Sequence, residues 1–407
     1  MMKQKFVAIL LILIMAGVVS PVFAQEDEED RRGKHYVVNF SLYYPISLNQ
    51  SEYDGVNFNL SLAYGKVGSV RGLDISAGAS AINDDLVGIQ LCGFIGVVGD
   101  TGRGMQISGL ISVAGDSFYG IQGSGLINVV GDDFKGFQST GIFNVAGHSG
   151  QGIQLAGLGN VAGETFSGIQ ASGVFNVTGE EFKGIQAAGI FSVAGDSCYG
   201  LQAAGVFNVT GDVLRGLQTA PFNIAAYSEG LQVGVVNIAG ASKGVQIGVV
   251  NYTQEENTGV PFGLVNLAEN GRIRGTVWGG NTVAATAGVK FAVHRLYSIL
   301  SIGYGNLNDN IGESLTYGFH YGGSFPVGNL SLGADLGYRF RDNKRLFRHT
   351  ELQPDQFMLE GRILLDVPLA GGFSLVLGAG GSYVFNTDES IRLGKLKPQV
   401  IAGIEFF

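Results

Sequence analysis

Acidic residues recur at one position of a repeated unit, where neighbouring carboxylates could hold a divalent cation. These acids are Asp100, Asp116, Asp132, Glu164, Glu180, Asp196 and Asp212. If successive units stack at about 4.8 Å, the carboxylates repel one another, and a cation such as Ca²⁺ would relieve that repulsion. Calcium-binding β-roll repeats, however, draw several oxygen ligands from a tighter glycine and aspartate pattern. We therefore expect solvated turn carboxylates here and no metal site.

The remaining reactive side chains do not form a catalytic pattern. The histidines are scattered along the chain, at His35, His148, His294, His320 and His349. The sequence has no H-E-x-x-H, phosphate-binding loop, C-x-x-C or Rossmann glycine motif after a strand. We expect no catalytic residue, no cofactor and no enzymatic activity.

One dense basic cluster could hold lipid phosphates through arginine contacts. Its members are Arg339, Arg341, Lys344, Arg345, Arg348 and His349. We expect these residues to form a solvated loop between two strands.

The formal charge is −9, and loss of an N-terminal signal with its two lysines makes it −11, so the composition argues against broad nucleic-acid binding.

The elements that position these side chains come from a short unit copied many times. Glycines fall sixteen residues apart without a slip from Gly72 to Gly216, and the third residue of the unit is glutamine in eleven successive copies, Gln90 to Gln246. A typical copy is GIQGSGLINVVGDDFK, residues 120–135. Such a period indicates stacked supersecondary units.

Two architectures fit the repeat. In a β-solenoid, each copy is one coil, and equal residues stack into amide ladders. The ladder residues would be Gln106, Gln122, Gln138, Gln154, Gln170, Gln186 and Gln202, with Asn128, Asn144, Asn160, Asn176 and Asn208. In the alternative, the repeats are further antiparallel strands of one large transmembrane β-barrel with an amide-lined lumen.

The tenth position favours the solenoid, since it is valine in every copy from Val97 to Val209. Lipid accepts any apolar side chain, whereas a packed column selects one shape. The turns also keep one length in successive copies, unlike most outer loops of barrels. Against this, a strand-like segment begins at Gly55, only seventeen residues before Gly72, so the barrel alternative stays open.

The two ends of the chain predict export and membrane strands. Residues 1–24 have the features of a cleaved signal peptide, 25–34 form a charged leader, and 35–70 contain two predicted strands. The repeat array spans 71–272, and 273–407 contain strands of alternating polarity typical of transmembrane barrels. The last strand, with Gly403, Phe406 and Phe407, is similar to the assembly signal of outer-membrane barrel proteins.

The repeat, with its leading Tyr44–Ser47, resembles an uncharacterised family of repeat-containing surface proteins of Gram-negative bacteria over roughly residues 36–270. The resemblance implies an outer-membrane or surface location. We predict an all-β, non-enzymatic outer-membrane protein whose array is a structural or interaction scaffold. Its expected partners are outer-membrane lipid, the barrel-assembly machinery and an unidentified surface ligand. The alternative function is a passive pore lined by glutamine and asparagine amides.

Overall fold

The structure is a computed structural model of the chain, and it describes residues 34–48, 51–305, 314–342, 356–386 and 395–406. Two compact units, Met1–Gly230 and Leu231–Phe407, divide the chain. The described residues of both units are mostly β-strand. Among them, no helix is long and apolar enough to span a membrane.

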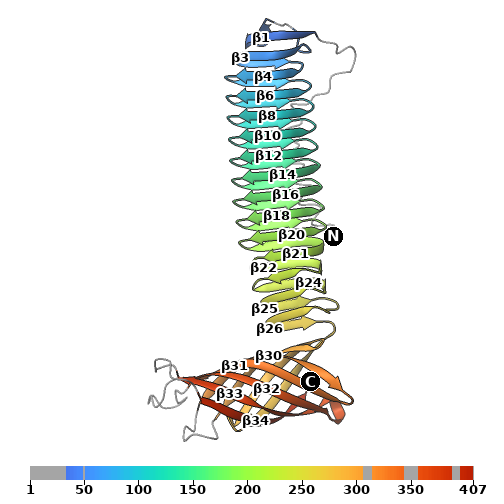
Figure 1. Cartoon of the computed structure of the whole chain (residues 1–407), viewed down its shortest axis with the longest axis vertical. Coiled ribbons are helices and arrows are strands. Elements are labelled where there is room, and N and C mark those ends of the chain that lie inside the picture. Colours follow the sequence, from blue (N-terminus) through green and yellow to red (C-terminus); the bar gives the residue numbers. More distant parts are fainter. Residues whose placement is uncertain (1–33, 49–50, 306–313, 343–355, 387–394, 407) are drawn as a thin grey trace. The chain divides into compact units, whose positions relative to one another are not determined.

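Each repeat of the first unit forms a coil of two strands, one with the glutamine column and a shorter one with the asparagine or a small residue in its place (Figure 1). The first strands of the coils are β4 (Val70–Ser76), with Asp74 in the glutamine column, and the glutamine strands β6 (Leu86–Cys92), β8 (Gly102–Ser108), β10 (Phe118–Ser124), β12 (Phe134–Thr140), β14 (Ser149–Ala156), β16 (Thr165–Ser172), β18 (Phe182–Ala188) and β20 (Cys198–Ala204). The shorter strands are β5 (Ala79–Ile82), β7 (Ile95–Val98), β9 (Ile111–Ala114), β11 (Ile127–Val130), β13 (Phe143–Ala146), β15 (Gly159–Ala162), β17 (Phe175–Thr178) and β19 (Phe191–Ala194). The unit begins with β1 (His35–Tyr43), β2 (Ile46–Ser47) and β3 (Gly55–Val67), and ends with β21 (Phe207–Thr219) and β22 (Phe222–Ser228).

Successive coils pair in parallel and in register. In β10 and β12, Gly120 lies opposite Gly136 and Gln122 opposite Gln138, and the same sixteen-residue offset relates the shorter strands β11 and β13. Equal positions of the repeat therefore stack on one another. The array is a β-solenoid, which confirms that prediction, and the alternative in which the repeats are strands of one large barrel is wrong.

The two N-terminal strands also belong to the stack. β1 pairs in parallel with β3, and β3 pairs in parallel with both β4 and β5. We predicted barrel strands at both ends of the chain, and this holds only for the C-terminal end. Gly55 lies seventeen residues before Gly72, close to the period of sixteen, because these strands are the first coils of the stack.

The interior of each coil is polar on one side and apolar on the other. Gln122 and Asn128 are completely buried, beside an apolar spine that includes Val130 and Phe134. The alternation of side chains along a strand then directs Ile121 outward, where it is 43% exposed. The solenoid thus buries amides and presents aliphatic side chains to its surroundings.

The first glycine of the coil is required by backbone geometry. Gly120 has φ +143°, and a Cβ at this position would overlap the carbonyl oxygen of Gly104 in the preceding coil. Equivalent glycines from Gly72 to Gly200 share this left-handed region and this close approach. An L side chain is strained there, which explains the unbroken glycine period.

We expect Gly120→Ala to lower the free energy of unfolding by roughly 1–3 kcal/mol, because it adds backbone strain and a clash between coils. Gly123→Ala in the same strand is the matched control, since its Cβ would lie 3.8 Å from Ile107 Cγ1 in ordinary contact. Urea unfolding, followed by far-UV circular dichroism, measures the free energy of unfolding of both variants. Equal midpoints for the two variants would contradict the geometric role of Gly120.

The second unit contains the last coils and a closed barrel. Its coil strands are β23 (Leu231–Val233), β24 (Val236–Ser242), β25 (Val245–Thr253) and β26 (Val260–Ala268). Its barrel strands are β27 (Gly271–Gly280), β28 (Ala285–Val293), β29 (Leu296–Tyr304), β30 (Leu315–Val327), β31 (Leu330–Asp342), β32 (Gln356–Pro368), β33 (Ser374–Asn386) and β34 (Lys395–Phe406), with a short 3-10 helix, η2 (Ala370–Gly372). Antiparallel pairing of β27 with both β28 and β34 closes the barrel.

The last coil of this unit contacts the barrel directly. Asn266 Nδ2 donates to Ser298 Oγ at 3.2 Å, and Ser298 Oγ donates to the Leu264 carbonyl at 3.0 Å. The ring of Phe262 packs edge-on against Tyr321, with 4.6 Å between centroids. The asparagine column of the coils therefore ends on a barrel hydroxyl.

Candidate functional site

The predicted glutamine residues form a buried hydrogen-bonded ladder in the first unit. Each Nε2 donates to the Oε1 of the preceding coil, at 2.6–3.0 Å from Gln106 through Gln218. All the predicted glutamines, Gln106, Gln122, Gln138, Gln154, Gln170, Gln186 and Gln202, are in this ladder and are completely buried. In the second unit Gln246 donates to Gln232 in the same way, at 2.9 Å.

The asparagine ladder runs in the opposite direction. Asn128 donates to Asn144, Asn144 to Asn160 and Asn160 to Asn176, at 2.8–2.9 Å, so each Nδ2 points to the following coil. Ser192 replaces the amide in the next coil, and Asn208 then donates to Asn223 at 3.1 Å. Because the two ladders have opposed amide dipoles, each offsets the field of the other.

Asp74 terminates the glutamine ladder, a role that we did not predict. Its Oδ2 accepts from Gln90 Nε2 at 2.9 Å, and its Oδ1 accepts from Asn59 Nδ2 at 2.7 Å. Asn59 Oδ1 in turn accepts from Asn39 Nδ2. A carboxylate has no amide donor, so it can accept from both directions where the ladder reverses. An acid in the glutamine column was the signal in the sequence.

We expect Gln154→Leu to lower the free energy of unfolding by about 1–3 kcal/mol for each amide left unpaired. The substitution removes the acceptor of Gln170 Nε2 and the donor to Gln138 Oε1. Gln151→Leu is the control, because Gln151 lies three residues away and is exposed. Denaturant unfolding compares the two, and an unchanged midpoint for Gln154→Leu would show that the ladder does not stabilise the coils.

Asp74 makes the stability of the coils depend on pH. Burial raises the pKa of Asp74, and the donors Ser80, Gln90 and Asn59 offset that effect in part. The folded state therefore favours the protonated carboxyl more than the unfolded state does, whose pKa is about 3.9. This contribution to stability is fully present below about pH 4 and is lost as the pH rises through the raised pKa.

The measurement is the difference in unfolding free energy between the wild type and Asp74→Asn as a function of pH. Asn places an amide donor against Gln90 or Asn59, which adds a penalty that does not vary with pH. We expect the wild-type advantage to shrink as the pH rises from about 4. A difference that stays constant from about pH 4 to about pH 8 would contradict the assignment.

The barrel interior holds a second polar network, made of charged side chains. Arg362 forms a bidentate pair with Asp335, with both N–O distances at 2.8 Å. Glu360 binds Arg339 through two contacts of 3.2 Å and His320 Nε2 at 2.8 Å. All five side chains are at most 2% exposed. At this level the lumen is filled with packed side chains, as expected for eight strands.

This network corrects the prediction of a basic loop. Arg339 and Arg341 lie in β31 and are buried in the barrel, where Arg341 donates to the Thr282 carbonyl at 3.0 Å. Lys344, Arg345, Arg348 and His349 lie outside the described residues. Side chains alternate along β31, and this alternation points both arginines into the lumen. A cluster of basic residues in the sequence does not show which of them point inward.

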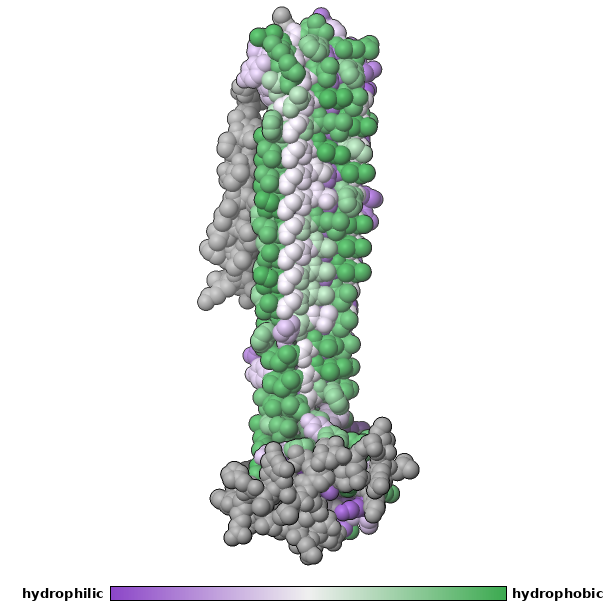
Figure 2. Space-filling view, turned by 90° about the vertical axis from the view of Figure 1, so that its left-hand side faces the viewer, coloured by the Kyte–Doolittle hydropathy of each residue, from purple (hydrophilic) through white to green (hydrophobic). Residues whose placement is uncertain are grey.

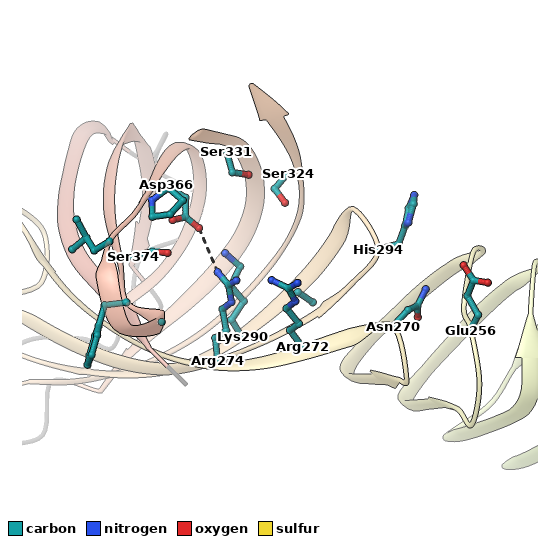
Figure 3. Close-up of a pocket in the computed structure, with 15 residues that line it drawn as sticks. Glu256, Asn270, Arg272, Arg274, Lys290, His294, Ser324, Ser331, Asp366 and Ser374 are labelled. Atoms are coloured by element: carbon teal, nitrogen blue, oxygen red, sulfur yellow. Dashed lines mark ion pairs between the residues drawn. The ribbon is translucent and has the colours of Figure 1, made fainter. Parts of the chain in front are cut away.

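A polar cavity of about 700 Å³ lies at the end of the barrel where β27 begins (Figure 3). Arg272, Arg274 and Lys290 extend into it side by side. Lys290 pairs with Glu405 at 2.7 Å, and Arg274 lies 3.4 Å from Glu405. The cavity therefore has its cations largely balanced by acids, and its geometry does not select a ligand.

The other predicted residues take structural places. The acids at the Gly-Asp turns stack on successive coils, as in the backbone bond from Asp132 N to the Asp116 carbonyl. Within the described residues, no group of three or more His, Cys, Asp or Glu side chains is placed to hold a metal ion. Gly403 lies opposite Trp278, and Phe406 opposite Gly275, at the β34–β27 seam. Phe407 lies outside the described residues.

No protein-family model matches the chain, and no curated protein matches it. Among solved structures, the N-terminal β-barrel domain of Pseudomonas aeruginosa OprF is similar to the chain at 13% sequence identity, with a TM-score of 0.25. The match covers 34% of this chain and 98% of that domain. A similarity at this score carries no argument about function.

Proposed function

We propose that the chain is a non-enzymatic outer-membrane protein in which the β27–β34 barrel anchors a scaffold made of the solenoid coils. The barrel's distribution of polarity is the observation that carries this proposal. Its interior contains ion pairs, whereas apolar side chains cover its exterior, among them Leu336 (75% exposed), Ile363 (61%) and Val400 (60%). In water such an exterior is unfavourable, and in a bilayer it is the stable arrangement.

Strand length and aromatic placement support the same proposal. The barrel strands have nine to thirteen residues, and a tilted transmembrane strand needs about ten. Exposed aromatic residues lie near both ends of the strands, such as Phe325 and Phe373 at one end and Tyr304 and Tyr317 at the other. Aromatic girdles of this kind mark the two interfaces of membrane barrels.

The lengths of the strand connections favour a periplasmic scaffold. At the end where β27 begins, the turns are His294–Arg295, Gly328–Asn329 and Leu369–Phe373. At the opposite end, most strands connect through the longer segments 305–314, 343–355 and 387–394. Outer-membrane barrels have short turns on the periplasmic side and longer loops outside. The coils precede β27 in the chain and so enter the barrel from the short-turn end.

This proposal replaces a surface location for the array with a periplasmic one. The predicted signal peptide would export the chain, and the predicted terminal strand would be read by the barrel-assembly machinery. The alternative function, a passive pore lined by glutamine and asparagine amides, loses its basis because those amides are buried inside the coils. A scaffold that holds periplasmic partners at the outer membrane agrees best with the geometry.

Thiol labelling of whole cells tests anchoring and sidedness together. We expect a bulky, membrane-impermeant maleimide to label Ala284→Cys on intact cells, since Ala284 is exposed at the long-loop end. Ser167→Cys, exposed on a coil, should react only after the outer membrane is permeabilised. The native thiols Cys92 and Cys198 are free but buried, and burial raises the pKa of Cys198 to about 12, so they should stay unlabelled.

Labelling of Ser167→Cys on intact cells would place the array outside and contradict the periplasmic assignment. Recovery of the protein in the soluble periplasmic fraction would contradict the membrane anchor itself. Planar-bilayer recordings provide an independent check, because the packed ion pairs of the lumen predict no steady channel steps. Regular open-channel conductance from correctly folded protein would contradict the scaffold in favour of a pore.

A further inference from the structure

The coils of the first unit segregate charge from apolar surface. Between Gly88 and Thr210, every Asp, Glu, Lys and Arg lies in the last five positions of its copy, Gly131–Lys135 in the typical one. We call this edge the charged corner. The other eleven positions of each copy contain no charged residue. Charged side chains therefore lie in water along the charged corner, and the remaining surface of the stack has none.

Two apolar ridges run along the uncharged side of the stack. The strand ridge follows the first glycine of each coil, and the corner ridge lies at the turn between the two strands of a coil. The strand ridge includes Ile89, Ile121, Phe137, Ile169 and Ile185, each 37–43% exposed, and the corner ridge includes Phe94, Leu110, Leu126, Leu158, Ile190 and Val206, each 38–57% exposed. Together they form what we call the apolar face.

A shallow groove lies between these ridges. It is lined by small residues on four successive coils, such as Ala187, Ala188, Ala203 and Ala204, and its volume is about 430 Å³. In earlier coils the exposed side chains of Leu91, Ile107 and Leu155 occupy the same column. Figure 2 shows apolar columns on either side of a paler column along one face of the stack. The apolar face therefore has regular ridges and, over those four coils, room for an inserted row of side chains.

We propose that the apolar face binds the same face of a second copy of this chain, forming a side-by-side dimer of solenoids. The repeat distance selects this partner. Side chains on a ridge recur once per coil, at about 4.8 Å, and rows with this spacing interdigitate fully only with rows of the same spacing. A second copy supplies such rows over the whole length of the face.

The area and the shape of the face are sufficient for a stable dimer. The face spans eight coils, roughly 40 Å at about 4.8 Å per coil, and the two ridges lie five residues apart, about 16 Å at about 3.3 Å per residue. Its area is therefore roughly 600 Å², the lower end of what each partner contributes to a specific interface. With a two-fold axis parallel to the stack, each corner ridge enters the groove of the other copy over the four coils that line it. The charged corners then point away from the interface and remain in water.

This inference concerns the coils of the first unit and does not depend on the proposed membrane anchoring. Cross-linking of the full chain in unfractionated cells tests it, wherever the chain is located. We expect Ile190→Cys, on the corner ridge, to give a species of twice the chain mass with a short bis-maleimide cross-linker, which spans the offset between the two corner ridges of the dimer. Ser167→Cys, exposed on the charged corner, is the control and should stay uncross-linked.

A second measurement uses purified full-length protein in lipid nanodiscs or detergent, with mass determined by light scattering. We expect wild type to be dimeric and Ile121→Lys/Leu126→Lys to associate at least about tenfold more weakly, because lysines would be desolvated in the interface. Tyr119→Lys changes the same strand two residues away, at the charged corner, and should leave the dimer intact. Circular dichroism confirms that each variant keeps its strands.

Three results would overturn the proposal. A folded wild type that is monomeric, with no Ile190→Cys cross-link, shows that the face does not bind a second copy. Co-purified lipid that covers the face of a monomer assigns the surface to acyl chains. Cross-linking of Ile190→Cys only to a different protein assigns it to another partner.

Discussion

The stack of buried amides is the constraint on which the rest of the structure depends. A primary amide has both donors and an acceptor, so identical amides one coil apart satisfy each other along the axis, as Gln154 does with Gln138 and Gln170. Burial of so many amides would be unfavourable if any were left unpaired. Equal coil length and exact register follow, because a one-residue slip would turn the column outward.

The apolar exterior is a consequence of the same constraint. Along a strand, neighbours of an inward glutamine must point outward, so Ile121 and Phe137 are exposed because Gln122 and Gln138 are buried. The barrel has the same arrangement, with polar groups inside and apolar groups outside: its ion pairs lie in the lumen and its aliphatic side chains cover the exterior. For the barrel, a bilayer would solvate the exterior. For the coils, a second copy with the same ridges would cover it.

The repeat and its ladder could be predicted from the sequence because a strict period makes each stacked position visible. The barrel strands were also predictable, because residues 273–407 alternate in polarity; only the start of β27, at Gly271, lies before the predicted boundary. The positions of Arg339 and Arg341 could not be predicted, because they depend on which face of β31 points into the lumen. Asp74 was visible in the sequence as an acid in the glutamine column, but its role follows only from the two donors that converge on it from opposite coils.

Side-chain hydrogen exchange in glutamine-selectively ¹⁵N-labelled protein tests the buried ladder most directly. Exposed Gln151 provides an internal reference. The ladder predicts that the amide protons of glutamines such as Gln122, Gln154 and Gln186 persist long after transfer to D₂O, while those of Gln151 disappear at once. Exchange of all glutamine side chains at the rate of Gln151 would contradict the ladder.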